Sequence, residues 1–179
     1  MRDLTRLPHE LDREAGTCHA IVETPKGNRA KYNYDPETGL FTFKKLLPEG
    51  MSFPLDFGFI PSTLCDDGDP LDVMILSEEP APVGALIKVR LVAVLAAEEQ
   101  EKGKIERNDR LIAVPEVSYL YAGVKNPDDL PDTFIDHLSQ FWVNKAKLEG
   151  KRFKVLRVGE PAEAIELVRH GAKVLKKAA

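Results

Sequence analysis

The chain has 179 residues, of which 43% are hydrophobic and 30% charged, so it can bury a core and is neither disordered nor fibrous. Its 25 basic and 29 acidic residues give a formal net charge of −4, which provides no electrostatic reason to expect nucleic acid or an anionic membrane as a partner. The longest apolar run, residues 91–97, is far short of a membrane span. From the length of the chain we expect a single domain over residues 1–179.

The N-terminal segment, residues 1–16, is polar and charged throughout. It predicts an arm or a short helix and lacks the apolar centre of a signal peptide. The two cysteines, Cys18 and Cys65, show neither a CxxC motif nor metal-ligand spacing, which suits a reducing compartment. Together these features predict a cytoplasmic protein.

Strands dominate the chain up to residue 115. Ala30, Tyr32 and Tyr34 alternate with polar residues, and the Pro-Glu-Thr-Gly turn at 36–39 leads into a second alternating run, so a hairpin is expected. The charged segment 98–104 is expected to be a connection that ends in a Lys-Gly-Lys turn. Strands are predicted over residues 30–35, 40–45, 72–76, 85–97, 109–115 and 151–158.

Helical spacing appears only late in the chain. It predicts one helix over residues 131–148, with Phe134, Leu138 and Trp142 on one face, and a second amphipathic helix over residues 161–177. Many strands followed by two helices, with no repeat or long linker between them, favour an α+β fold built on a small closed barrel.

Residues 66–72 (Asp-Asp-Gly-Asp-Pro-Leu-Asp) crowd four carboxylates into one loop. Such carboxylates repel each other unless a positive charge lies among them, and oxygen ligands suit a hard divalent cation such as Mg²⁺. An acidic surface turn is the plainer alternative, since Asp, Gly and Pro are common turn residues. A calcium EF-hand loop fits poorly, because the glycine is misplaced and a proline interrupts the loop.

The order Asp-Gly-Asp-Pro-Leu-Asp at 67–72 resembles the signature of family I soluble inorganic pyrophosphatases. The resemblance continues in the family's order over residues 18–155. It includes Glu23-Thr24-Pro25, Lys31-Tyr32, the aromatic segment 53–60, residues 110–115 and the helix around Phe141. It implies an OB-like five-stranded β-barrel with two C-terminal helices, and assembly as a homo-oligomer.

The resemblance also implies hydrolysis of pyrophosphate to two orthophosphates. Both the substrate and hydroxide are anionic, so divalent cations, Mg²⁺ or alternatively Mn²⁺, would neutralise charge and lower the pKa of a bound water. By resemblance the catalytic carboxylate is Asp69, the metal ligands are Asp67, Asp72, Glu23 and Asn108, and the substrate-binding cations are Lys31, Lys45, Arg110 and Lys145.

Several positions depart from the family's pattern. Because Asn108 brings no charge where a carboxylate is usual, we expect the metal site nearest to it to be weak or missing. Asp109 should point to the opposite face of its strand, and a glutamate within residues 98–106 could replace the ligand only if the loop is rearranged. The departures are Asn33 for a glutamate, Lys45 for an arginine, Phe57 for a tyrosine, Asn108 and Gly103 for two aspartates, and Lys145-Ala146 for a Tyr-Lys pair.

These departures leave other functions open. A phosphate- or nucleotide-binding relative with weak or no hydrolysis, or a hydrolase of another phosphoanhydride, would also fit Asn33 and Asn108. Asp69 favours catalysis, because a mere binder gains little from a carboxylate beside an anion. An OB-type nucleic-acid binder is disfavoured, since Tyr32 and Phe43 alternate as core residues do and the acidic loop would repel a phosphate backbone.

Overall fold

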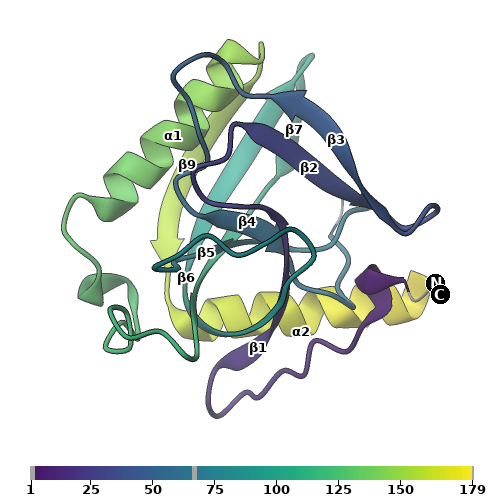
Figure 1. Cartoon of the computed structure of the whole chain (residues 1–179), viewed down its shortest axis with the longest axis vertical. Coiled ribbons are helices and arrows are strands. Elements are labelled where there is room, and N and C mark those ends of the chain that lie inside the picture. The colour runs from purple at the N-terminus through teal and green to yellow at the C-terminus, as the bar shows by residue number, and fades with distance from the viewer. Residues whose placement is uncertain (1–2, 66–67, 179) are drawn as a thin grey trace.

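The computed structural model describes residues 3–65 and 68–178. Five of its strands close into a ring (Figure 1), through the pairs β1–β4, β4–β5, β5–β8, β8–β6 and β6–β1. Only the β5–β8 pair is parallel. The bounds are β1 Thr17–Thr24, β4 Asp56–Phe59, β5 Asp72–Ile75, β6 Leu86–Glu101 and β8 Arg110–Pro115. The closed five-stranded barrel predicted from the sequence is therefore confirmed.

The longest strand, β6, extends beyond the barrel. Its charged C-terminal end pairs with β7 (Lys104–Arg107) on one side and with β9 (Arg152–Gly159) on the other. The expectation that residues 98–104 form a connection was wrong for 98–101, because pairing on both edges keeps this polar run extended. Only the expected turn remains, at Lys102 and Gly103, both with positive φ.

A separate two-stranded sheet, the predicted hairpin, consists of β2 (Ala30–Asp35) and β3 (Leu40–Leu46). Tyr34 is buried against Phe41 and Phe59 and ties the hairpin to the barrel. Phe43, expected in the core, is 58% exposed and packs against the edge of Tyr32 instead. An isolated pair of strands has only one face covered by the barrel, so alternation alone did not identify the buried side.

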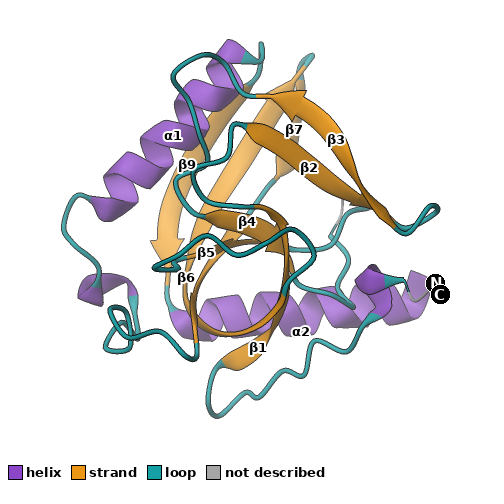
Figure 2. Cartoon of the chain, viewed as in Figure 1, coloured by secondary structure: helices purple, strands orange, loops and turns teal. Residues whose placement is uncertain are grey.

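Two α-helices cover the barrel (Figure 2): α1 (Phe134–Leu148) contacts β9, and α2 (Pro161–Ala178) contacts β6. Helix α1 begins at Phe134 rather than at Pro131. Two short 3₁₀ helices are η1 (Leu4–Arg6) in the N-terminal arm and η2 (Pro127–Asp129). Of the helices in residues 3–65 and 68–178, none combines the length and apolar character that crossing a membrane requires.

The hydrophobic core has an aromatic part that supports the site described below. Phe53 before β4, Phe57 on β4 and Phe153 on β9 each pack against Trp142 on α1, and all four side chains are at most 4% exposed. This cluster fixes α1 against the barrel, so that the inner face of the helix forms one wall of a cavity.

Candidate active site

One cavity, with a volume of about 650 Å³, opens between the barrel, the β2–β3 hairpin and the C-terminal end of α1. Side chains far apart in the sequence meet there. All the site residues predicted from the sequence that the structure describes line it: Glu23, Lys31, Lys45, Asp69, Asp72, Asn108, Arg110 and Lys145. Asp67, the remaining predicted ligand, lies outside the described residues.

The acidic side of the cavity combines Glu23 from β1 with Asp72 at the start of β5 and Asp69 from the loop before it. Burial raises the pKa of Glu23 to about 7, a hydrogen bond from the backbone N–H of Tyr34 (2.7 Å) opposes that rise, and the nearby negative charges of Asp72 and Asp69 add to it. Carboxylates gathered in a buried site repel one another, and a cation between them stabilises their charged forms.

The chemistry of this donor set suits a hard divalent cation. It consists of oxygen atoms, and it includes the buried Oδ1 of Asn33, which has no hydrogen-bond donor within the described residues. Among residues 3–65 and 68–178, no three His, Cys, Asp or Glu side chains are grouped closely enough to hold a metal by themselves. Asp67 falls outside that range, and carbonyl oxygens such as those of Asn33 and Asn108 are also suitable ligands.

Arg110 lies between the acidic side and the aromatic core. Its side chain is buried, and Nη1 donates a hydrogen bond to Oδ2 of Asp72. The guanidinium carbon is 3.8 Å from the centre of the Trp142 ring. It is farther from the ring centres of Phe57 (5.5 Å) and Phe153 (5.4 Å). Faces of aromatic rings stabilise a buried guanidinium group. The Nε–H is buried and has no acceptor in the part of the chain described.

The cationic side is formed by Lys31 on β2, Lys45 on β3 and Lys145 on α1. Burial lowers the pKa of Lys31, which the charge of Asp72 partly offsets. Lys145 is only 7% exposed, and burial lowers its pKa to about 8 against the opposing effect of Glu149. Lysines in these positions can hold the oxygens of a phosphate as point charges.

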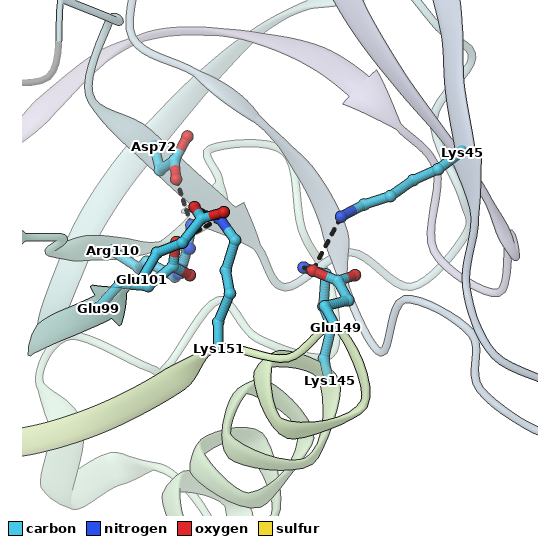
Figure 3. A network of polar contacts seen from close by, with 8 residues as sticks. All are labelled: Lys45, Asp72, Glu99, Glu101, Arg110, Lys145, Glu149 and Lys151. Atoms are coloured by element: carbon cyan, nitrogen blue, oxygen red, sulfur yellow. Dashed lines mark hydrogen bonds and ion pairs between the residues drawn. The ribbon is translucent and has the colours of Figure 1, made fainter. Parts of the chain in front are cut away.

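Glu149 is a cavity residue to which the sequence analysis assigned no role. Its Oε2 accepts hydrogen bonds from Nζ of Lys45 (2.8 Å) and from Nζ of Lys145 (3.0 Å). Figure 3 shows its carboxylate between the ends of these two side chains. Nothing in the local sequence indicates this, because Lys45 lies more than a hundred residues away.

Lys151, the residue immediately before β9, is a second missed residue. Its Nζ forms ion pairs with Glu99 (2.8 Å) and Glu101 (3.0 Å) on the extension of β6 (Figure 3). Glu99 and Lys151 line the cavity. From the sequence, a glutamate within residues 98–106 was considered as a replacement metal ligand. The structure places Glu99 at the cavity but pairs it with Lys151.

Asp109, expected to point away from the cavity, borders it. Its Oδ1 accepts hydrogen bonds from Nε of Arg107 (2.7 Å) and from the backbone N–H of Ala97 (3.0 Å). Asp109 precedes β8 rather than lying within it, so the alternation of a strand does not apply to it. The hydrogen bond from Ala97 holds Asp109 against β6. The preceding residue, Asn108, also lines the cavity.

A small closed barrel with carboxylates on one side of a cavity and lysines and an arginine on the other defines a protein that can bind a cation together with a phosphate anion. The family model described as inorganic pyrophosphatase matches residues 20–176. The chain belongs to the inorganic pyrophosphatase family.

Individual relatives agree with this assignment. An inorganic pyrophosphatase of Synechocystis sp. is 32% identical over 97% of this chain and 99% of its own, and one of Bradyrhizobium diazoefficiens is 37% identical over 89% of each. The crystal structure of the inorganic pyrophosphatase from Thermus thermophilus superposes with a TM-score of 0.89 at 32% identity, covering 98% of this chain and 99% of that one. Coverage this complete shows that the whole fold is shared.

Proposed function

We propose that this protein hydrolyses pyrophosphate to two orthophosphates with Mg²⁺ as its cofactor and Mn²⁺ as a substitute. The observation that carries the proposal is the meeting of Asp69, Asp72 and Glu23 with four cationic side chains in one cavity. Membership of a metal-dependent hydrolase family supports it. A cavity of about 650 Å³ is ample for a small phosphoanhydride with its cations.

Divalent cations, when bound, would neutralise phosphate charge and lower the pKa of the attacking water. In the proposal Asp67 and Asp72 hold cations directly, and Glu23 holds a further one. Asn108 contributes only a neutral carbonyl oxygen, which makes its site the weakest.

Asp69 is proposed to orient the attacking water and to accept its proton. The oxygen of that water forms a bond to one phosphorus atom while the bond from this phosphorus to the bridging oxygen breaks, and the second phosphate leaves with that oxygen. Four cationic side chains that line the cavity hold the phosphate oxygens through this step: Lys31, Lys45, Arg110 and Lys145. Arg110 lines the cavity while its Nη1 remains on Asp72, which supports its role.

We also propose a homo-oligomer in the cytoplasm. The exposed apolar side chains Val117, Tyr119 and Leu120, each at least 75% exposed, support contact between copies of the chain. Cys18, a free thiol buried in β1, suits a reducing compartment. Light scattering coupled to size-exclusion chromatography would measure the mass in solution.

Orthophosphate release from pyrophosphate, tripolyphosphate and ATP, each with Mg²⁺, with Mn²⁺ and with EDTA, tests the substrate and the metal together. We expect release from pyrophosphate to exceed the others and to stop in EDTA. A phosphate-binding protein without hydrolysis is the second candidate, favoured by the neutral Asn33 and Asn108 and by the pairing of Asp72 with Arg110. Metal-loaded protein that binds phosphate but releases none from any substrate would establish that candidate instead.

A further inference from the structure

Glu149 occupies an unfavourable position for an acidic residue. It is the C-cap of α1, where the partial negative charge of the helix end disfavours a carboxylate. Its partner Lys145 precedes it by four residues, which is the less favourable order for an ion pair on a helix. Acidic residues placed against local preference are found at functional sites, where another requirement outweighs the cost.

The surroundings of Glu149 point to the same conclusion. Its side chain is only 15% exposed, and its Oε1 is buried with no hydrogen-bond donor among the residues described. A buried carboxylate oxygen without a donor is costly. The other oxygen, Oε2, accepts from two lysines at once, so a single oxygen atom holds both ammonium groups.

A phosphate oxygen needs the same surroundings as that Oε2 atom. Lys45 and Lys145 are two of the cations proposed to hold the substrate, and their Nζ atoms converge on a point inside the cavity (Figure 3). An anionic oxygen that accepts from two ammonium groups is the usual arrangement for a bound phosphate. In this structure the carboxylate of Glu149 takes that place.

We propose that the Glu149 carboxylate is a built-in competitor for a phosphate seat formed by Lys45 and Lys145, from which bound phosphate displaces it. This rests on the proposed function, because it takes both lysines as phosphate ligands. The competitor weakens the binding of phosphate at this seat. It therefore favours release of the orthophosphate product and makes Glu149 a determinant of affinity rather than a catalytic residue.

A purely structural role for Glu149 predicts the opposite effect on binding. If the carboxylate only neutralised Lys145 and kept the two lysines in position, its removal would let them separate and would weaken phosphate binding. Competition predicts that removal strengthens binding. The direction of the change in affinity therefore separates the two roles.

The test is the dissociation constant of inorganic phosphate, measured by calorimetry for the native protein and for Glu149→Gln, with Mg²⁺ and separately with EDTA. The measurement is made near pH 6.5, well below the pKa of about 8 of Lys145, so that this lysine is charged. Glu116→Gln is the matched control, since it removes the same charge from a surface pair with Lys88 (3.0 Å) outside the cavity.

We expect Glu149→Gln to bind phosphate at least about threefold more tightly, a change of the size that loss of one competing charge produces, and Glu116→Gln to match the native protein. Unchanged or weaker binding in Glu149→Gln, or no detectable binding in either protein, would overturn the proposal. Should Glu149→Gln not fold, Glu149→Ala is measured in the same way.

A crystal structure of the native protein with phosphate tests the displacement without any variant. We expect a phosphate oxygen between Lys45 and Lys145, with the Glu149 carboxylate moved away. Phosphate bound elsewhere, with both ion pairs of Glu149 intact, would contradict the proposal. Hydrolysis by the native protein with unchanged phosphate binding in Glu149→Gln would refute this inference alone, whereas no hydrolysis by the native protein would refute the proposed function.

Discussion

The guanidinium group of Arg110 stacks on Trp142, with its central carbon 3.8 Å from the centre of the indole ring. Arg110 comes from barrel strand β8 and Trp142 from helix α1, so this contact joins the two walls of the cavity. The indole Nε1–H contacts the Sδ atom of Met74 (3.1 Å) on β5, which fixes the ring plane against which the arginine lies. The aromatic core thus positions a cation of the site.

Replacing Trp142 with alanine should lower both stability and affinity. Loss of a buried indole is expected to reduce the free energy of unfolding by about 3–5 kcal/mol, measured by urea denaturation followed by circular dichroism. Trp142→Phe, which keeps a ring beneath Arg110, should cost less and should retain a lower KM for pyrophosphate than Trp142→Ala. Equal KM values for the two variants would show that the stacking does not position Arg110.

Changing Asn108 to aspartate should strengthen metal binding. The substitution adds a charged oxygen ligand beside the cavity, and we expect the Mn²⁺ concentration for half saturation of the weakest site to fall about tenfold. Electron paramagnetic resonance of free Mn²⁺ measures this without turnover. Gln140→Glu adds the same charge at an exposed position of α1 outside the cavity and should have no effect. An equal shift in both variants would mean that only the net charge matters.

The affinity for pyrophosphate should fall above about pH 8. Burial lowers the pKa of Lys145 to about 8, so the side chain is charged below that pH and loses its charge as the pH rises through it. The groups that act on it are Glu149, which raises this pKa, and Lys45 and Lys31, which lower it. When KM is measured from pH 6 to pH 10, its value in the native protein should therefore increase above about pH 8. Lys145→Arg, which stays charged, should lose this rise; the same rise in both proteins would assign it to another group.

Gly58 should tolerate no side chain. A Cβ atom at this position of β4 would lie 1.8 Å from the carbonyl oxygen of Ile21 on the neighbouring strand β1. The backbone of the closed barrel cannot yield at this point, so Gly58→Ala should cost about 3 kcal/mol or more and lower the yield of folded protein. Gly123→Ala is the matched control, because a Cβ there meets nothing within 4 Å. Similar melting temperatures for the two variants would contradict this explanation.

The sequence predicted the parts of the site that have a local signature. The acidic loop places Asp69 and Asp72 only three residues apart, and the hairpin was evident from alternation around a Pro-Glu-Thr-Gly turn. Lys31 and Lys45 then line the cavity because the two strands of that hairpin lie side by side. In these cases a short stretch of chain contains both the residue and the reason for its position.

Other features depend on contacts between distant segments. The role of Glu149 depends on its ion pair with Lys45, and the role of Lys151 depends on its ion pair with the extension of β6. That extension looked like a connection because its residues are charged; it is a strand because β7 and β9 pair with both of its edges. Alternation in the hairpin did not show which face the barrel covers, so Phe43 was wrongly placed in the core.

Orthophosphate release from pyrophosphate by the native protein and by Asp69→Asn, with Mg²⁺ present, tests the central claim most directly. Asparagine keeps the shape of Asp69 but cannot accept a proton, so we expect release to fall by about 100-fold or more, while exposed Asp132→Asn matches the native protein. Metal-dependent release that survives in Asp69→Asn would contradict the role of Asp69, and no release by the native protein would contradict the proposed hydrolysis itself.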